Sequence, residues 1–286
     1  MTQFIYLADS HSGANPMGYQ QQRAYPEKLA AIVDALRQLI KTEKGIDFVL
    51  HGGDMINATS EENIRAAALL FTLDLPVYLC LGNHDLTAPD ALQQWLRLAP
   101  QFFPGDKPEY SIETEDCLIH VVPNHWDTLP YYWEKKQFAH FCEEQLTFLN
   151  AALSSNTDRP HFLSTHTPVF GLPPEQTGLE EPYHFPNEEL TETLTNLTAR
   201  HSHLHCVLGA HNHLNMHVKK DDVHFVTASA IVETPFEFKL FDVSKEAITM
   251  QTVTLANRME GTAEYDFNKT FVQGRGVDRG FSFTLA

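Results

Sequence analysis

Short apolar runs rich in β-branched and aromatic residues alternate with amphipathic stretches over the first three quarters of the chain. Residues 3–8 are typical of a strand, and residues 26–42 place apolar side chains at three- and four-residue intervals, as one face of a helix does. The pattern repeats with a strand at 46–50, a helix capped by Ser60 and a strand at 76–81. This alternation predicts an α/β layered domain.

The same alternation continues further along the chain and then gives way to a β-rich region. Further strands are predicted at 118–122, 161–165 and 204–208, helices near 142–154 and 187–199, and later strands at 214–219, 223–228, 236–242 and 247–254. The glycine-bearing tail breaks the periodicity and fits either a strand-bearing extension or a dimer arm. We therefore divide the chain into a domain at 1–255 and a C-terminal extension at 256–286.

Composition narrows the class of protein. The 286 residues are 43% hydrophobic and 20% charged, which is ordinary globular usage. No apolar run approaches the length of about 20 residues that spans a bilayer, so we expect no membrane protein. The N-terminus lacks the basic start and apolar stretch of an export signal, and the four cysteines show no paired spacing. We expect a cytoplasmic protein without a disulfide scaffold.

The net charge argues against one class of partner. Lys plus Arg is 20 and Asp plus Glu is 37, so the formal charge is 20 − 37 = −17. This sign opposes binding to a polyphosphate backbone over a broad face, and no nucleic acid polymer is expected as a partner. A homo-oligomer stays open.

Polar residues interrupt the apolar pattern just after five predicted strands, at the end of the sheet where α/β proteins build their sites. These residues are Asp9, His11, Asp54, Asn83, His166, His211 and His213. Each short motif alone is common, but the string Gly82-Asn83-His84-Asp85 together with four further motifs in order is not a coincidence. Carboxylate, amide and imidazole donors without thiolate suit Mn, Fe, Co or Zn.

Seven such ligands are enough for two divalent metal ions, with an Asp carboxylate between them. Two ions about 3.5–4 Å apart share a water whose pKa falls toward neutrality, so a metal-bound hydroxide would be the nucleophile. A phosphate ester is the natural electrophile, because two cations neutralise its non-bridging oxygens. The sequence therefore predicts a hydrolase of small phosphate esters.

The order Asp-x-His, Gly-Asp, Gly-Asn-His-Asp, His, His-x-His resembles that of the calcineurin-like metallophosphoesterase superfamily over roughly residues 3 to 255. Within it, the pattern is most similar to class III cyclic nucleotide phosphodiesterases and glycerophosphodiesterases. The resemblance implies a four-layer α/β/β/α sandwich of two mixed β-sheets flanked by helices. It also implies a preference for phosphodiesters.

The resemblance further implies how the residues share the work. Asp9, His11 and His213 would hold one metal, Asn83, His166 and His211 the other, and Asp54 would bridge them. His84 would sit beside the substrate, stabilise the phosphoryl group and protonate the leaving oxygen, with Asp85 as its orienting partner.

Three positions depart from the family pattern or lack a role. Ala210 separates Gly209 from His211, where the family usually has Gly-His-x-His, so the loop is expected to turn differently. Asn57 stands where purple acid phosphatases have an iron-binding tyrosine, which argues against that subgroup. His51 is left without a role.

Alternatives remain at this point. A phosphomonoesterase or nucleotide pyrophosphatase fits the same metal centre, and a non-catalytic scaffold fits the fold. The segments 123–136 and 167–186 are long and non-periodic and would overhang the site. Four aromatic residues of the first segment are compatible with stacking on a base and, more simply, with packing: Trp126, Tyr131, Tyr132 and Trp133.

Overall fold

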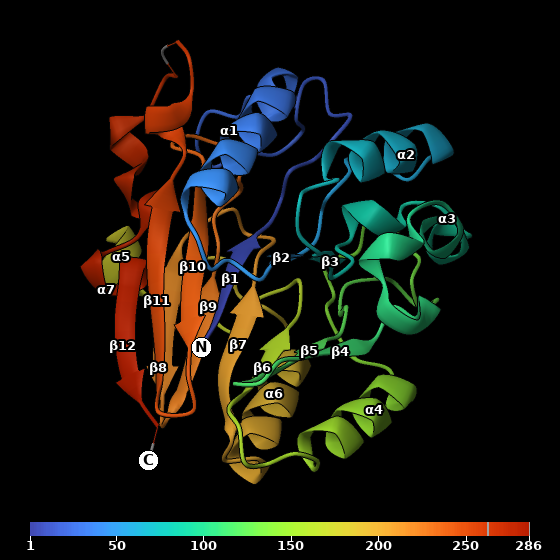
Figure 1. The fold of residues 1–286 in the computed structure, drawn as a ribbon, viewed down its shortest axis with the longest axis vertical. Helices are drawn as coiled ribbons and strands as arrows, with labels where there is room; N and C mark the ends of the chain where they lie inside the picture. Colours follow the sequence, from blue (N-terminus) through green and yellow to red (C-terminus); the bar gives the residue numbers. More distant parts are fainter. Residues whose placement is uncertain (262, 286) are drawn as a thin grey trace.

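The computed structural model describes residues 1–261 and 263–285, whose strands form two six-stranded sheets (Figure 1). The strands are β1 (Thr2–Leu7), β2 (Phe48–His51), β3 (Val77–Leu79), β4 (Tyr110–Glu113), β5 (Leu118–Val121), β6 (His161–Ser164), β7 (Leu204–Gly209), β8 (Met216–Lys220), β9 (Val223–Thr227), β10 (Glu237–Val243), β11 (Ala247–Thr254) and β12 (Gly280–Thr284). The α-helices are α1 (Leu29–Thr42), α2 (Glu61–Leu70), α3 (Ala91–Leu98), α4 (Glu143–Leu153), α5 (Pro174–Thr177), α6 (Glu188–Arg200) and α7 (Gly276–Arg279).

Both sheets are mixed, with parallel strands at their centres. The first sheet has the order β12-β11-β10-β1-β2-β3, in which β1, β2 and β3 are parallel and β10 to β12 antiparallel. The second has the order β4-β5-β6-β7-β9-β8, in which β5, β6, β7 and β9 run parallel. The carboxyl ends of parallel strands in both sheets can therefore supply site residues.

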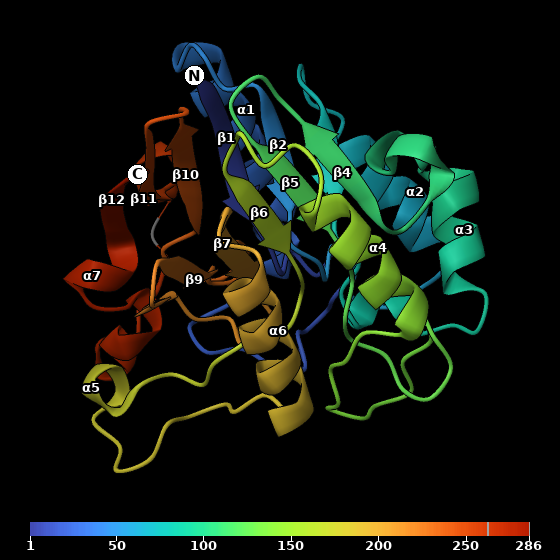
Figure 2. The ribbon, with the colours of Figure 1, turned by 90° about the horizontal axis from the view of Figure 1, so that it is seen from below.

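The two sheets pack face to face through aromatic side chains. Phe162 of β6 meets Phe4 of β1 with ring centroids 5.7 Å apart and Phe241 of β10 at 5.8 Å, both edge to face. Helices α1, α2 and α3 lie outside the first sheet, and α4 and α6 lie outside the second (Figure 2). Leu149 of α4 and Leu194 of α6 are fully buried against that second sheet. The predicted α/β fold of two mixed sheets flanked by helices is confirmed.

The predicted elements recur with ends shifted by at most three residues, the largest shift being at α1, which begins at Leu29 and not at residue 26. Four strands and α-helices before β12 were not predicted. Ser60 caps α2 as expected, since its Oγ accepts a hydrogen bond from Asn63 N at 3.1 Å. Strand β4 and helices α3, α5 and α7 were missed because each is short and buries few apolar residues. In the tail, β12 pairs antiparallel with β11, so this segment bears a strand. Among the described residues, no helix has the length and apolar character needed to cross a membrane.

Candidate active site

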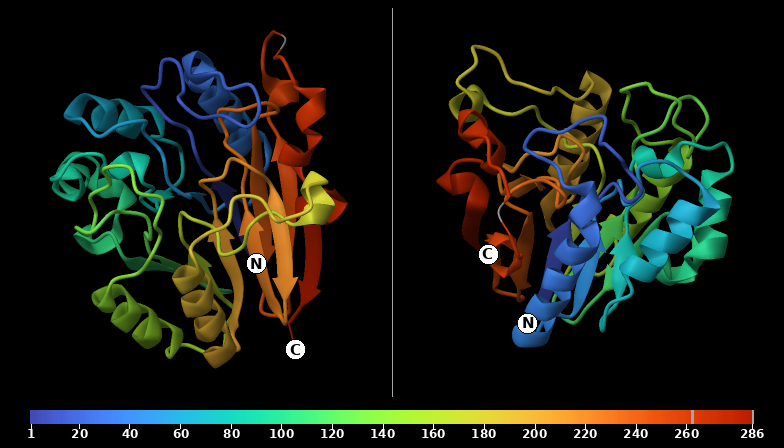
Figure 3. Two further views of the ribbon diagram at one scale, coloured as in Figure 1. Left: turned by 180° about the vertical axis from the view of Figure 1, so that it is seen from behind. Right: turned by 90° about the horizontal axis from the view of Figure 1, so that it is seen from above.

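The predicted ligands come from loops that leave the carboxyl ends of strands in both sheets. Asp9 and His11 follow β1, Asp54 follows β2 and Asn83 follows β3, whereas His166 follows β6. His211 and His213 follow β7, and all seven side chains are brought together beyond the carboxyl ends of these strands. The long loops around residues 12–25, 123–142 and 165–187 lie over the same side of the molecule (Figure 3).

The backbone at the site is held in an uncommon conformation. Five of the seven predicted ligands have a positive φ, namely Asp9 (55°), His11 (44°), Asp54 (53°), His211 (64°) and His213 (59°). Residues with a Cβ enter this left-handed region rarely and at a cost of about 1–3 kcal/mol each. Strain of this kind collects at functional sites, where the surrounding structure must maintain it.

Two glycines let the loops approach one another closely. Gly53 has a φ of 110°, and a Cβ there would collide with the ring of His166 and the backbone of Gly82. A Cβ on Gly82 would collide in turn with Asp54. The Gly-Asp and Gly-Asn motifs therefore require glycine, because the loops that follow β2 and β3 touch at these positions.

One group of ligands consists of Asp9, His11 and His213. One donor atom from each lies within 4.8 Å of the others. The Nε2 atoms of His11 and His213 are 3.2 Å apart, and His213 Nε2 is 3.8 Å from Asp9 Oδ1. This is the set that the resemblance assigned to a single metal.

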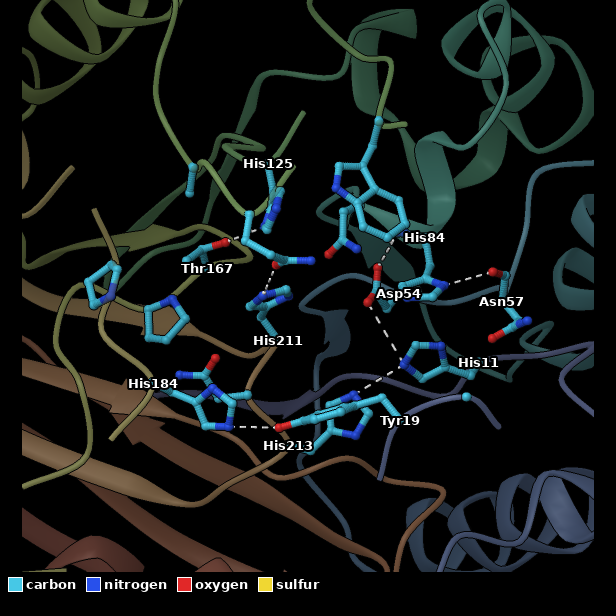
Figure 4. A pocket seen from close by; sticks show the side chains of 18 of the residues that line it. His11, Tyr19, Asp54, Asn57, His84, His125, Thr167, His184, His211 and His213 are labelled. Carbon is cyan, nitrogen blue, oxygen red and sulfur yellow. Dashed lines mark hydrogen bonds and ion pairs between the residues drawn. The ribbon is translucent and has the colours of Figure 1, made fainter. Parts of the chain in front are cut away.

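The second group consists of Asp54, His166 and His211, with Asn83 beside it. The donor atoms of the three again lie within 4.8 Å of one another. His166 Nε2 is 3.3 Å from Asp54 Oδ2 and 3.2 Å from Asn83 Oδ1. Asp54 Oδ2 also lies 3.8 Å from His11 Nε2, so this one oxygen faces both groups, as a bridging ligand must (Figure 4).

Unsatisfied polar atoms indicate that the groups fit metal ions. Both carboxylate oxygens of Asp9 and the Nδ1 atom of His11 are buried without a hydrogen-bond partner in the described part of the chain. A buried carboxylate with no partner is costly. Oxygen and imidazole donors converging on it suit a divalent cation of the Mn, Fe, Co or Zn type.

The electrostatics of the site follow from burial and from its two carboxylates. Burial raises the pKa of Asp9 to about 6, against the opposing effect of His213 and His166. Burial also opposes ionisation of Asp54, but the charge of His166 holds the pKa of Asp54 well below its ordinary value. Burial lowers the pKa of His11 and His211, which favours the neutral imidazoles that ligate metals.

Glu233 is a functional residue that the sequence reasoning missed. Its Oε1 lies 2.6 Å from His213 Nδ1, and its Oε2 accepts hydrogen bonds from Gln21 N at 3.0 Å and Gln22 N at 2.5 Å. A carboxylate behind a ligating imidazole fixes the ring and raises its basicity. The available signal was a single acid in the otherwise uncharged run 228–236.

His84 stands beside both ligand groups, but Asp85 does not orient it. His84 Nδ1 pairs with the Asn57 carbonyl at 2.8 Å, and its backbone N–H donates to Asp54 Oδ1 at 2.8 Å. Asp85 instead accepts from the backbone N–H groups of Ile56 at 3.0 Å and Gly82 at 2.9 Å. Asp85 therefore supports the loops, and the orienting role that we expected for it belongs to the Asn57 carbonyl.

The two other uncertain positions now have structural roles. Ala210 is buried, and its N–H donates to the His166 carbonyl at 2.7 Å, so the altered loop still delivers both later histidines to the site. His51 Nε2 lies 3.0 Å from Ser10 Oγ, which joins the first-strand and second-strand loops.

A cavity of about 410 Å³ opens at the ligand groups. Trp133 lines it with its ring centroid 5.1 Å from that of His84, whereas Trp126 is fully buried and donates to His140 Nε2 at 3.0 Å. Tyr131 packs against Trp126 and bonds to Glu109, away from the cavity wall. Of the four aromatic residues singled out in the segment 123–136, Trp133 is the one that lines this cavity.

Comparisons with known proteins place this geometry in a family. The sequence profile described as calcineurin-like phosphoesterase matches residues 2–215. A comparison with curated proteins finds no match.

Solved structures resemble the chain at low sequence identity. A dimetal phosphatase from Danio rerio is 15% identical with a TM-score of 0.65, covering 89% of this chain and 96% of its own. GAP50, the anchor in the inner membrane complex of Plasmodium, is 13% identical with a TM-score of 0.62, covering 93% and 88%. A putative 5'-nucleotidase from Staphylococcus aureus is 11% identical with a TM-score of 0.55, covering 92% and 56%. These likenesses show a shared fold. The profile match over residues 2–215 shows that the chain belongs to the calcineurin-like phosphoesterase family.

Proposed function

We propose that this protein hydrolyses small organic phosphodiesters with two divalent metal ions. One observation carries the proposal: the Asp54 carboxylate faces two ligand groups at once, and His84 stands beside both. Asp9, His11 and His213 would hold one ion, Asn83, His166 and His211 the other, with Asp54 shared. Two such ions activate water at neutral pH and neutralise the non-bridging oxygens of a phosphoryl group.

His84 would move the proton that the leaving oxygen needs. Because the Asn57 carbonyl can only accept, the proton on His84 resides on Nδ1, and Nε2 is the nitrogen left for the substrate. In the imidazolium form, Nε2 would donate to the leaving oxygen as the ester bond breaks. The backbone N–H of His84 donates to Asp54 Oδ1, which ties the His84 backbone to the ligand groups.

The charge of the cavity supports diesters over monoesters. No Lys or Arg is found among the described residues that line it. A monoester at neutral pH carries close to two negative charges and a diester carries one, so the diester needs less positive charge from the walls. The Danio rerio neighbour is a dimetal phosphatase, and a monoesterase is therefore the rival to test.

The test compares bis(4-nitrophenyl) phosphate with 4-nitrophenyl phosphate after loading the protein with Mn, Fe, Co or Zn in turn. We expect hydrolysis of both to depend on metal and kcat/KM to favour the diester. Faster turnover of the monoester would replace the diesterase by a phosphatase. Less than one equivalent of bound Mn, with no turnover, would favour a scaffold, in line with the anchor role of GAP50 in Plasmodium.

A further inference from the structure

We propose that the cavity selects esters whose organic group is uncharged and apolar, and that Trp133 is the residue that recognises this group. This inference rests on the proposed hydrolysis at the same site and names its substrate class. It excludes esters with a second phosphate, a carboxylate or an ammonium group on the organic part.

Few charged residues line the cavity, and this is the first reason to expect the selectivity. Within the described residues, Asp54 is the one carboxylate that lines the cavity, and it belongs to the ligand groups. The amides of Asn57, Gln137 and Asn187 supply neutral polar groups instead. A charged organic group would thus lose its hydration without gaining a counter-ion, which disfavours its binding.

The position of Trp133 carries the second step. Its ring lies 5.1 Å from His84, the group placed to protonate the leaving oxygen. Its indole N–H donates to the Lys136 carbonyl at 2.8 Å, and its backbone N–H donates to Leu86 O at 2.8 Å. The donor of the indole is therefore occupied, and the fixed ring offers an apolar face next to the leaving group.

Apolar residues at the cavity mouth extend this face. Phe185 lines the cavity and is 68% exposed, and Met17 and Tyr19 line it from another loop. The two loops are joined where Tyr19 Oη lies 2.8 Å from His184 Nε2. Exposed apolar surface around a cavity is typical of a binding site for an apolar ligand.

Two charged ligand types are the rivals to compare directly. Aromatic faces also bind quaternary ammonium groups, so a choline-like ester is the nearest rival. Lys135 and Lys136 are exposed on the Trp133 loop but do not line the cavity, and as basic residues of that loop they are the candidates to test for binding a second phosphate.

The experiment measures binding by calorimetry to the Mn-loaded protein, using hydrolysis-resistant phosphonates. One ligand carries a 3,3-dimethylbutyl group and its isostere carries a trimethylammonioethyl group, so the pair differs in charge and not in shape. Phosphonoacetate and methylene diphosphonate add a carboxylate and a second phosphoryl group. We expect the dimethylbutyl ligand to bind about 10-fold tighter than its isostere or methylphosphonate.

Variants assign the preference to its residue. W133A should lose the roughly 10-fold preference for the dimethylbutyl ligand over methylphosphonate, and W133F should keep most of this preference. F267A, which removes an 81% exposed aromatic in the tail, is the matched control and should change nothing.

Tighter binding of the ammonium isostere would overturn the inference. The inference would also be overturned if methylene diphosphonate bound more tightly than the dimethylbutyl ligand and if this tighter binding were lost in K135A/K136A. Hydrolysis of aryl diesters without the neutral preference would refute this inference alone. The preference without any hydrolysis would refute the proposed function and leave the selectivity standing.

Discussion

Strand β6 has buried histidines at both ends, and the two surroundings differ. His161 is its first residue and lies beside His120 and His203, with ring centroids 5.0 and 4.4 Å away. His166 lies two residues beyond its last residue and belongs to the candidate metal centre. Both groups hold several imidazoles in a buried place.

In the group around His161, the buried imidazole nitrogens are satisfied by hydrogen bonds. His120 Nδ1 lies 2.8 Å from Ser111 Oγ, and His120 Nε2 lies 2.9 Å from His161 Nδ1, whose other nitrogen pairs with Asn156 O at 3.1 Å. The candidate metal centre around His166 also contains carboxylates, and both oxygens of the Asp9 carboxylate lack hydrogen-bond partners among the described residues. Clustered imidazoles alone do not mark a metal site. Converging carboxylates with unsatisfied oxygens distinguish it.

Removing the Asp54 carboxylate, which both ligand groups share, should have the largest effect on the candidate metal centre and none on the His161 group. We expect Asp54→Ala to abolish phosphoester hydrolysis and to loosen both ions, because this side chain faces both ligand groups. Metal content by mass spectrometry and turnover of an aryl diester measure the two effects. Asp116→Asn, which changes a buried carboxylate bound to Thr2 and the N-terminus, is the control. Two equivalents of tightly held metal in Asp54→Ala would contradict the bridging role.

His84 separates binding from chemistry within the metal centre. His84→Ala should keep both ions and lower the rate by roughly 10²-fold or more, the usual scale for a proton-transfer or charge-stabilising group. His120→Gln, in the other histidine group, should keep the full rate. Kinetics on metal-loaded proteins would show this, and an unchanged rate in His84→Ala would refute its role.

Glu233 tests whether the carboxylate behind a ligand matters. Glu233→Gln should weaken one ion by roughly 10–100-fold, because it removes the negative charge that holds and polarises His213. Calorimetric titration of the metal-free protein resolves the two sites. Glu237→Gln is the matched control, since Glu237 is an equally buried carboxylate that pairs with Arg279 instead. Equal loss in both variants would point to general destabilisation.

The hydrogen-bonded histidines around His161 should make the free energy of unfolding depend on pH. Burial lowers the pKa of His120 to about 3, whereas an unfolded histidine titrates near 6.5. As pH falls from 6.5 toward 3, the unfolded chain binds a proton that the folded chain does not. The free energy of unfolding should therefore fall by up to about 1.4 kcal/mol per pH unit from this group. Urea unfolding of the metal-free protein at pH 7, 6 and 5 should show a shallower fall in His120→Gln, and parallel curves would contradict the assignment.

The sequence predicted most of the fold because its strands and helices carry strong apolar periodicity. Strand β12 shows where this fails: Phe281 and Phe283 alternate correctly, but the segment is short, glycine-flanked and defined by pairing with β11. The described structure also places Phe281 against His224 with ring centroids 4.1 Å apart, a contact between distant parts of the chain. Local pattern cannot contain such information.

The ligands were predictable because they stand in short motifs directly after strands. Glu233 and Trp133 were harder, since neither belongs to such a motif and both act through distant partners, His213 and His84. The role of Asp85 was wrong for the same reason, because which hydrogen bonds a buried carboxylate makes depends on how two loops meet. Tertiary geometry decides these roles.

The left-handed backbone conformation at five ligand positions means that the residues needed for activity lower the stability of the fold. Glycine adopts that conformation without strain, so replacing one of these ligands by glycine relieves a local cost of about 1–3 kcal/mol and removes the chemistry. This relief exceeds or offsets the roughly 0.4–1 kcal/mol that the greater unfolded-state entropy of glycine costs. In the absence of ions, the inactive chain would then compete well with the active one. Mutational drift in a lineage released from the need to hydrolyse esters would therefore meet little resistance from folding at these positions, and the ligands would be among the first residues to change.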